Sequence, residues 1–476
     1  MNLSRIVERW ADHTPGRTAF HFHGEDISYA ELWRRTERTT RQLAGAGISH
    51  GDRIAFLGYN HPDMLALLFA AARLGAILVP LNWRLTVHEH KVILADCAPA
   101  LLFFEPEFAE HAAELPVDTR HAMGAALPEA DPRLTGSDDD EVLIVYTSGT
   151  TAAPKGAVLT QSALLWNGLN SIHAHDLRQD DHVLSPLPMF HVGGLNNQTL
   201  PALLAGATVT LHKRFEPGQW LADVATRKPT LSLLVPATMQ AVIGHPDWDK
   251  TDLSSLRMLN TGSMVVPESL IRAFHARKVP VGQIYGATET APLAAVLMAH
   301  DAYARPGSAG KAALHCEVRI VDHEVQVRGP NVMRRYWNNP AATAAAFAED
   351  GWFRTGDLGR WDEDGFLWID GRSKDLIISG GENIHPAELE NVLADCPAIA
   401  ESAVIGIEDA KWGESACAVI VRQAGAQLDE AGVLALFKDR LARYKHPRRV
   451  VFFEALPKNA MGKVQKFELK KLVTGR

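Results

Sequence analysis

The sequence predicts an α/β protein with a large N-terminal domain of parallel sheets, a small β subdomain and a small α+β C-terminal domain. Three observations support this prediction. Short apolar strands alternate with helical patterns as far as residue 263, which is typical of βαβ units. From Arg319 the pattern changes to short alternating strands separated by Gly and Asp turns. A polar stretch, residues 370–375, then precedes a compact final unit.

The first elements follow directly from local patterns. Apolar residues fall at helical spacing from Leu3 to Trp10, and residues 19–23 are strand-like. The run Ser28-Tyr29-Ala30-Glu31 has the form of a capping box that opens a helix through about residue 43. A strand at 53–58, a helix at 62–74 and a strand at 77–81 then make the first βαβ unit.

The remaining elements are predicted in the same way. Helices are expected at residues 87–95, 162–174, 195–204, 386–393 and 429–441. Strands are expected at residues 100–104, 183–187, 208–211, 231–236, 258–263, 325–327, 366–369, 400–407, 416–421 and 449–453. Residues 105–141 are interpreted as a helix plus a surface connection, and His173-Ala174-His175 as a solvated helix end in preference to a metal site.

Composition and charge exclude several classes of protein. With 46% hydrophobic and 22% charged residues the chain is globular, and a net charge of -8 supplies no general attraction to nucleic acid, so no nucleic-acid partner is expected. The 4 cysteines are scattered and indicate neither zinc nor disulfides. The charged N-terminus lacks a signal-peptide core, and the longest apolar stretch, residues 64–72, is too short to span a bilayer. We therefore expect a cytoplasmic protein without an integral membrane segment.

One loop carries the strongest functional signal. Residues 146–156, Tyr-Thr-Ser-Gly-Thr-Thr-Ala-Ala-Pro-Lys-Gly, follow the apolar run 142–145. Small residues let backbone N–H groups and hydroxyls approach an anion, and Lys155 adds a positive charge, so the loop suits a polyphosphate. Pro154 before the lysine and Gly156 after it exclude the common nucleotide-triphosphatase loop. An ordinary surface turn is the alternative, because the same residue types are frequent in turns.

Five further stretches supply groups that a nucleotide and an acyl group require. Residues 285–290, Tyr-Gly-Ala-Thr-Glu-Thr, offer an aromatic face for a base and a carboxylate, Glu289, for Mg²⁺. Asp357, in Thr-Gly-Asp, suits a ribose diol. The others are the charged linker 371–375, the Ser-Gly-Gly-Glu-Asn-Ile turn 379–384, and the loop 457–463 that ends in Lys463.

In this order the stretches resemble the acyl-adenylate-forming (ANL) superfamily, and within it the acyl-CoA synthetases. The resemblance covers essentially the whole chain, and six motifs in register are very specific. It implies that carboxylate and ATP give acyl-AMP and pyrophosphate, after which the CoA thiol attacks to give acyl-CoA and AMP. The implied substrates are ATP, CoA and a small-molecule carboxylic acid, with Mg²⁺ as cofactor. Dimers are common among relatives, so a homodimer is one option, although oligomeric state cannot be read from the sequence.

The resemblance implies a role for each matching position. The phosphates of ATP would be bound by Thr147, Ser148, Gly149, Thr150, Thr151 and Lys155. The nucleotide would further contact Gly262, Ser263, Tyr285, stacked on the adenine, Gly286, and, at the ribose, Asp357 and Arg372. Thr288 and Glu289 would contact the α-phosphate and Mg²⁺, with Glu289 as metal ligand. Lys463 would bridge the attacking carboxylate and the α-phosphate, since two anions that react need their accumulating charge neutralised.

The second half-reaction involves other positions. By resemblance, residues 1–370 form the AMP-binding domain, 371–375 the hinge and 376–476 a mobile C-terminal lid domain. The lid would turn about Lys374 between the two steps, which suits a polar linker. Gly380 and Gly381 would then border the pantetheine tunnel, and His191 would gate between substrate and tunnel. Two alternatives stay open: an enzyme that loads a carrier protein, disfavoured because no carrier domain follows Lys463, and an inactive nucleotide-binding relative.

The sequence departs from the family pattern at a few positions. Ala152 replaces a glycine of the loop, and Met461 replaces a common threonine. These two departures are the signs that would favour the inactive nucleotide-binding relative. The substrate is expected to be an uncharged acid, because residues 191–204 contain no Asp, Glu, Lys or Arg and Ile284 stands where malonate-type relatives carry arginine. Ligases of ferulate or benzoate and of medium-chain fatty acids fit equally. Asn196 and Asn197 could bond a ring hydroxyl or be solvated or structural.

Overall fold

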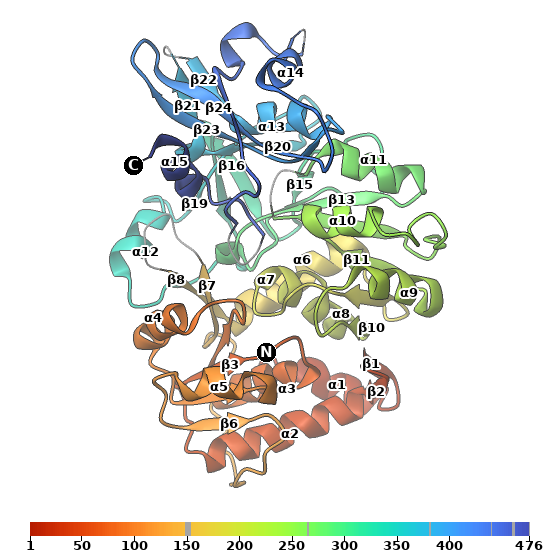
Figure 1. Ribbon diagram of the computed structural model, residues 1–476. Helices are drawn as coiled ribbons and strands as arrows, with labels where there is room; N and C mark the ends of the chain where they lie inside the picture. Colours follow the sequence, from red (N-terminus) through yellow and green to blue (C-terminus); the bar gives the residue numbers. More distant parts are fainter. Residues whose placement is uncertain (148–153, 264–265, 380–381, 439, 459–461, 476) are drawn as a thin grey trace.

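The structure confirms the α/β class, with a large N-terminal part and a smaller C-terminal part. This computed structural model describes residues 1–147, 154–263, 266–379, 382–438, 440–458 and 462–475. Within these residues the strands form four sheets. The two large sheets and their helices make up most of the molecule. The C-terminal elements gather at one end, beside the strands that follow residue 316 (Figure 1).

The larger of the two main sheets has nine described strands in the order β15-β14-β13-β12-β11-β9-β10-β1-β2. The strands from β13 to β1 pair in parallel, and the edges are antiparallel. Their bounds are β1 Thr18–Phe22, β2 Glu25–Ser28, β9 His182–Ser185, β10 Thr208–Leu211, β11 Leu231–Leu233, β12 Met258–Gly262, β13 Val281–Tyr285, β14 Ala295–Val296 and β15 Lys311–Ala312.

The second main sheet has seven described strands in the order β18-β8-β7-β4-β3-β5-β6. The strands from β7 to β6 are parallel, whereas β8 and β18 are added antiparallel. Their bounds are β3 Arg53–Leu57, β4 Ile77–Leu81, β5 Leu101–Phe104, β6 Arg120–Ala122, β7 Glu141–Thr147, β8 Lys155–Thr160 and β18 Arg335–Tyr336. The glycine-rich stretch therefore joins the two strands of an antiparallel hairpin at the end of a parallel sheet.

Two smaller sheets follow. The β subdomain contains β16 Glu317–Val321, β17 Glu324–Arg328, β19 Phe353–Trp361 and β20 Leu367–Arg372. Asp322 and His323 both have positive φ, 49° and 66°, and close the β16–β17 hairpin as a tight turn. The C-terminal sheet contains β21 Ile377–Ser379, β22 Glu382–Ile384, β23 Ile399–Asp409, β24 Gly413–Arg422 and β25 Arg449–Phe452.

The helices cover the faces of these sheets. Those of the N-terminal part are α1 Arg5–His13, α2 Tyr29–Gly45, α3 Pro62–Leu74, α4 Val87–Cys97, α5 Ala109–Ala113, α6 Gln161–His175, α7 Val192–Gly194, α8 Leu200–Ala205, α9 Pro217–Arg227, α10 Pro236–Ile243, α11 Glu268–Ala276 and α12 Pro340–Ala346. The C-terminal helices are α13 Pro386–Ala394, α14 Glu430–Ala435 and α15 Lys466–Thr474. Short turns are η1 Pro106–Phe108, η2 Leu195–Thr199, η3 Thr288–Thr290, η4 Ser373–Asp375 and η5 Arg443–Lys445.

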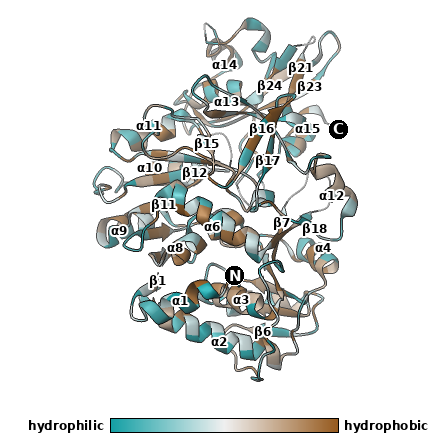
Figure 2. Ribbon diagram, turned by 180° about the vertical axis from the view of Figure 1, so that it is seen from behind, coloured by the Kyte–Doolittle hydropathy of each residue, from teal (hydrophilic) through white to brown (hydrophobic). Residues whose placement is uncertain are grey.

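Helix α3 is buried on all sides. It begins after His61, whose ring accepts a hydrogen bond from the Asp63 N–H, and it ends at Gly75, where φ is 72°. Residues 64–72 are each at most 3% exposed, and α3 packs against α2, β4 and β7. A helix that is apolar around its whole circumference must be covered by other elements, so this run builds the main core. Surface helices such as α2 carry hydrophilic residues (Figure 2).

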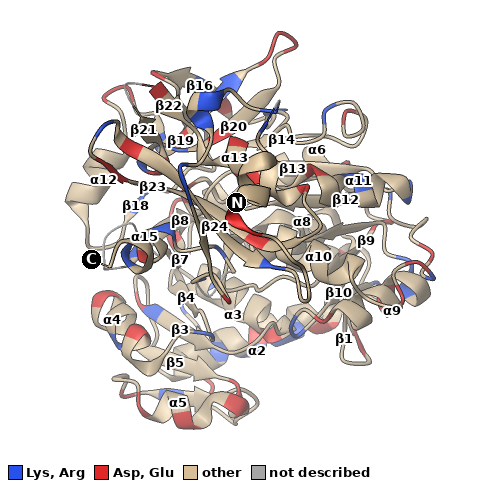
Figure 3. Ribbon diagram, turned by 45° about the horizontal axis from the view of Figure 1, so that its top comes forward, with Lys and Arg blue, Asp and Glu red and all other residues tan. Residues whose placement is uncertain are grey.

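Surface charge and helix length bear on possible partners. Acidic and basic residues are interspersed over the face that Figure 3 presents. In the part of the chain that the structure describes, no helix is both long enough and apolar enough to cross a membrane.

Three expectations about local structure were wrong in whole or in part. The predicted helix at 429–441 is shorter than expected and consists of α14 alone. From Leu436 the backbone forms mainly i to i+3 hydrogen bonds, and in this tighter turn the Phe437 side chain is completely buried. Residues 105–141 also contain a strand, β6, paired with β5. The predicted helix at 195–204 is present, and its first part is a π-helical segment, η2. His175 is 1% exposed and bonded to Ser171, and burial lowers its pKa to about 4, so of the two histidines at this helix end only His173 is exposed to solvent.

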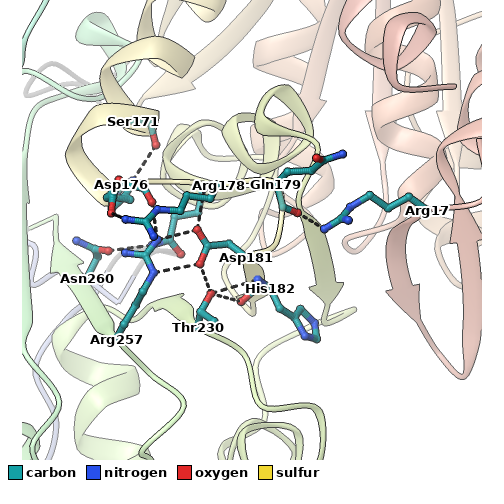
Figure 4. Close-up of polar contacts among 12 residues, drawn as sticks. Arg17, Ser171, Asp176, Arg178, Gln179, Asp181, His182, Thr230, Arg257 and Asn260 are labelled. Carbon is teal, nitrogen blue, oxygen red and sulfur yellow. Dashed lines mark hydrogen bonds and ion pairs between the residues drawn. The ribbon is translucent and has the colours of Figure 1, made fainter. Parts of the chain in front are cut away.

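A buried ion pair ties the end of α6 to the centre of the nine-stranded sheet (Figure 4). The Asp181 carboxylate, on a residue 5% exposed, accepts hydrogen bonds from Arg257 at 2.7 and 3.0 Å and from Thr230 Oγ1 at 2.6 Å. Arg257 also donates to the Asp176 carbonyl at 2.9 Å. Burial alone would raise the pKa of Asp181, but these hydrogen bonds outweigh it and hold the pKa below its usual range.

We expect Asp181→Asn to lower the free energy of unfolding by about 3 kcal/mol at pH 7, because Arg257 loses its charged partner. This value is at the lower end of the range for breaking a buried ion pair, because the Arg257 side chain is 33% exposed. The folded-state pKa of Asp181 is lower than its unfolded-state pKa. The contribution of Asp181 to the free energy of unfolding is therefore complete above the unfolded-state pKa, and it is lost as the pH falls through the folded-state pKa. Urea unfolding should show the wild-type advantage shrinking in acid. Exposed Asp180→Asn is the control, and a pH-independent difference would contradict the assignment.

Candidate active site

The hairpin β7–β8 and strand β18 bring a lysine, a tyrosine and a carboxylate together. Lys155, the first residue of β8, pairs with Thr147 at the end of β7. Its Nζ lies 5.3 Å from the ring centroid of Tyr336, within cation–π range. Tyr336 donates a 2.6 Å hydrogen bond to Glu289 Oε1. Burial raises the pKa of Tyr336, so its hydroxyl stays protonated and remains a donor.

A second cluster lies where β13 meets the β subdomain. Asp357 on β19 pairs in register with Arg372, the last residue of β20, and their side chains form a 2.6 Å ion pair. Tyr285, at the end of β13, donates to the other oxygen of Asp357 at 2.9 Å. Burial raises the pKa of Asp357, which is 7% exposed, although Arg372 opposes the shift. The Arg372 guanidinium also interacts electrostatically with Glu289, so the two clusters adjoin.

The C-terminal lysine reaches this second cluster. Lys463 follows Gly462, whose φ is 77°, and it interacts electrostatically with Arg372, Asp357 and Lys374. Desolvation by the surrounding protein lowers the pKa of Lys463, and the nearby Arg372 lowers it further. The same physical cause, burial, lowers the pKa of Lys374 in η4. One cation from the C-terminal domain and two from the linker region therefore converge on Asp357.

Two glycines at this edge are required by the close approach of backbone. A Cβ on Gly286 would lie 1.5 Å from the Pro292 carbonyl oxygen, and one on Gly262 would lie 2.4 Å from the Ile284 carbonyl oxygen. Gly262 ends β12, next to Tyr285 at the end of β13. Ser263 follows with φ of 75°, in the left-handed region. Carboxyl ends of adjacent parallel strands are where open α/β sheets bind ligands.

His191 is bonded within its own turn. Its Nδ1 accepts a 3.0 Å hydrogen bond from the Gly193 N–H at the start of α7, so any proton on the neutral ring is at Nε2. Burial lowers the pKa of His191 to about 4, and the ring is therefore neutral at pH 7. The turn that follows it borders a small cavity with room for about one water molecule, lined by Ser185, Pro186, Leu187, Gly193, Gly194, Gln198 and Leu233.

The structure thus brings together most of the predicted residues that it describes. Thr147, Lys155 and Glu289, with Thr288 beside it in η3, form one part of the site, and Gly262, Ser263, Tyr285, Gly286, Asp357, Arg372, Lys374 and Lys463 the other. Ser148, Gly149, Thr150, Thr151, Gly380 and Gly381 lie outside the described residues. Tyr336 was missed, because its pairing through β18 to β8 spans a long stretch of sequence; the aromatic pair Tyr336-Trp337 before the helix cap Asn339 was the available signal.

The donor set suits a hard cation held jointly with a ligand. Glu289 offers carboxylate oxygen, and Thr288 stands next to it in the same turn. Among the described residues, no group of three or more His, Cys, Asp or Glu side chains could cage a metal. Mg²⁺ is commonly bound by one or two carboxylates together with substrate phosphates, and this arrangement fits that mode.

Fold and site together define an adenylate-forming enzyme with a large nucleotide-binding part and a small C-terminal part. The chain belongs to the AMP-binding enzyme family: residues 7–337 match the family model "AMP-binding enzyme" and residues 388–463 match "AMP-binding enzyme C-terminal domain".

Relatives of known name cover the full length. The chain is 49% identical to the indoleacetate–CoA ligase of Aromatoleum aromaticum, over 99% of this chain and 98% of that protein. It is 41% identical to a feruloyl-CoA synthase of Amycolatopsis, with 97% of both chains covered. The solved o-succinylbenzoate CoA synthetase of Bacillus subtilis, in complex with its acyl-adenylate, superposes with a TM-score of 0.90 at 32% identity, over 98% of this chain and 97% of that one.

The same synthetase in complex with ATP and magnesium ion gives a TM-score of 0.89 at 31% identity, over 98% of this chain and 99% of that chain. These findings confirm the family and the ligase activity predicted from the motifs. The chain is an AMP-forming acid–CoA ligase that uses ATP, Mg²⁺ and CoA.

Proposed function

We propose that this ligase activates an uncharged aromatic acid, with a medium-chain fatty acid as the second candidate. The absence of charged side chains from one stretch of sequence carries the argument. Residues 191–204 contain no Asp, Glu, Lys or Arg to pair with a second charge on the substrate. The relatives named for indoleacetate and ferulate are 49% and 41% identical, whereas one named for long-chain fatty acids is 34% identical.

The two clusters support the residue roles in the first half-reaction that the family resemblance implies. Asp357, which is paired with Arg372 and Tyr285, accepts hydrogen bonds from the ribose hydroxyls. The phosphates are bound by Thr147, by Lys155 and by the segment 148–151. Glu289 holds Mg²⁺, which neutralises phosphate charge when bound. Lys463 lies near Asp357 and neutralises the charge between the carboxylate and the α-phosphate.

For the second half-reaction, the lid domain, residues 376–476, turns about the linker 371–375. Lys463 then leaves the site, and the Gly380-Gly381 turn borders the path of the pantetheine arm. His191 is neutral and bonded to its own turn, so it can gate the path between the acid and CoA sterically without acting as a charged group.

The test is AMP release with Mg²⁺ and ATP over a panel of fatty, benzoic, cinnamic and arylacetic acids, with and without CoA. Release that requires both an aromatic acid and CoA is the expected result. Pyrophosphate exchange without CoA-dependent release would instead indicate a protein carrier as acceptor, and silence in both assays would contradict the proposal. We also propose that the protein forms a homodimer, which light scattering would test. A cytoplasmic location is proposed as well, and cell fractionation would test it.

Tyr336→Phe should raise the Mg²⁺ concentration that half-saturates pyrophosphate exchange by about tenfold. Tyr336 fixes one oxygen of Glu289, and losing a hydrogen bond to a charged group costs about 1.5 kcal/mol, which is about tenfold. Exposed Tyr303→Phe is the control. If the Mg²⁺ dependence is unchanged while thermal stability falls, Tyr336 has a structural role only.

A further inference from the structure

The hairpin β7–β8, which carries the described ends of the phosphate loop, is tied to helix α4 by a side-chain hydrogen bond. Tyr146, on β7, donates from its hydroxyl to Asp96 Oδ2 on α4 at 2.6 Å. Burial raises the pKa of Tyr146, so the hydroxyl keeps its proton and remains a donor. Neither residue belongs to the two clusters of the candidate site, and the contact therefore needs an explanation of its own.

The ring of Tyr146 reaches α4 by crossing the hairpin at a glycine. Tyr146 pairs in register with Gly156. A Cβ on Gly156 would lie 3.0 Å from Tyr146 Cζ and 2.7 Å from Ile144 Cγ2, which is too close for either atom to stay in place. The glycine therefore leaves room for the ring in the position from which its hydroxyl contacts Asp96.

The opposite face of the hairpin carries the predicted phosphate ligands. Successive side chains of a strand point to opposite faces of the sheet, so Thr147 points away from the face that carries Tyr146. Lys155 pairs with Thr147 and lies on that same opposite face. Its Nζ contacts the ring of Tyr336, whose centroid is 5.3 Å away. The hydrogen bond to Asp96 thus fixes one face of the hairpin, and the other face presents a hydroxyl and an ammonium group.

The end of α4 is a fixed point to which a hairpin can be tied. Arg53, at the start of β3, donates at 2.8 Å to the carbonyls of Cys97 and Ala98, the two residues that follow Asp96. A carboxylate in the last turn of a helix is disfavoured by the helix dipole, so the stability of α4 does not account for an aspartate here. The hydrogen bond from Tyr146 does account for it.

The backbone of Asp96 also holds the segment that follows β18. Its carbonyl accepts hydrogen bonds from Trp337 Nε1 at 3.2 Å and from Asn338 Nδ2 at 2.8 Å. The Trp337 N–H in turn donates to a carbonyl of β8 at 2.7 Å. The residue before it, Tyr336, donates to Glu289. Asp96 therefore joins the phosphate hairpin to the segment that fixes the proposed Mg²⁺ ligand.

We propose that Asp96 and Tyr146 are positioning residues, which hold the hairpin so that Thr147 and Lys155 meet the two phosphates that leave as pyrophosphate. They act through the hairpin and do not touch the nucleotide. The inference rests on the proposed function, because it presupposes that phosphate binds at Thr147 and Lys155. Since pyrophosphate leaves with adenylate formation, the pair serves the first half-reaction and not the second.

The test separates the two half-reactions. Tyr146→Phe removes the hydroxyl and keeps the ring. It should raise KM for ATP and for pyrophosphate in the exchange assay by about tenfold, the size of a lost hydrogen bond to a charged group. KM for the acid and the rate of thiolation of synthetic acyl-AMP should stay within about twofold, because neither involves pyrophosphate. Unchanged KM values for ATP and pyrophosphate overturn the proposal, and so does an equal loss in both half-reactions.

Variants of the acceptor provide an independent readout. Asp96→Ala should give the same change as Tyr146→Phe, and the double variant should be no worse than either, because all three remove the same contact. Asp96→Asn keeps an acceptor and should show a smaller rise in KM for ATP. Tyr303→Phe, at a tyrosine that is 51% exposed, is the control. Additive losses in the double variant, or an Asp96→Asn enzyme no better than Asp96→Ala, would overturn the proposal.

Lys155→Ala distinguishes a failure of this inference from a failure of the proposed function. If Lys155→Ala leaves KM for ATP and for pyrophosphate unchanged, the phosphates do not bind at this hairpin and the phosphate site of the proposed function fails. If Lys155→Ala raises both values and Tyr146→Phe raises neither, only the positioning role fails.

Discussion

Lys463→Ala should abolish adenylate formation while synthetic acyl-AMP is still converted to acyl-CoA. Lys463 interacts with Asp357, Arg372 and Lys374, the groups around the proposed ribose site. A positioned cation there lowers the barrier only while two anions react, which is the first half-reaction. Removing one such electrostatic contact costs about 10² to 10³ in rate. The second half-reaction has a neutral or thiolate sulfur as nucleophile and, in the proposed rotation, proceeds after Lys463 has left.

The measurement is pyrophosphate exchange for the first step and thiolation of synthetic acyl-AMP for the second. Lys458→Ala is the matched control, because this lysine lies close in sequence but its side chain pairs with Glu401 at 2.8 Å. Only a selective loss supports the assigned role; a similar loss in both steps points to damage to the C-terminal domain and contradicts it.

Glu289→Gln should lower pyrophosphate exchange by about a hundredfold and weaken its dependence on Mg²⁺. The backbone of Glu289 is fixed, since its carbonyl accepts a 2.7 Å hydrogen bond from the Met333 N–H, and Tyr336 fixes Oε1. The substitution therefore keeps shape and position but removes the charge that a hard cation prefers. Loss of one electrostatic contact to the reacting phosphates is of this size.

Calorimetry provides a readout independent of turnover. Wild-type enzyme should bind ATP more tightly with Mg²⁺ than without it, and Glu289→Gln should reduce that difference, whereas Glu268→Gln on the exposed side of α11 should not. Equal Mg²⁺ dependence in wild type and Glu289→Gln would exclude Glu289 as metal ligand.

Local patterns predicted most of the elements because their signals are short-range. Ser28 caps α2 as expected, accepting a hydrogen bond from the Glu31 N–H, and the apolar run 64–72 became a fully buried helix. The α14 prediction failed because apolar periodicity continues through Phe437, and periodicity alone does not distinguish a continuing helix from tighter turns that bury the same side chains.

The residues of the candidate site likewise differ in whether a local pattern in the sequence reveals them. The motif residues Lys155, Glu289 and Asp357 were found from the sequence, because each sits in a turn of distinctive composition. Tyr336 was not, because it acts through a partner far away in the chain: its hydroxyl donates to Glu289. This pair depends on where β18 packs, which no local pattern in the sequence specifies.

Arg372 has two neighbours of different kinds. On one side it is the end of β20, clamped to Asp357; on the other it leads without any spacer into Ser373–Asp375 and the C-terminal sheet. The proposed hinge therefore begins at the residue whose guanidinium is paired with Asp357, on the side of the large N-terminal part. If the lid turns as proposed, Lys463 can move away while the Asp357–Arg372 pair stays in place, and we expect the adenylate to remain bound between the two steps.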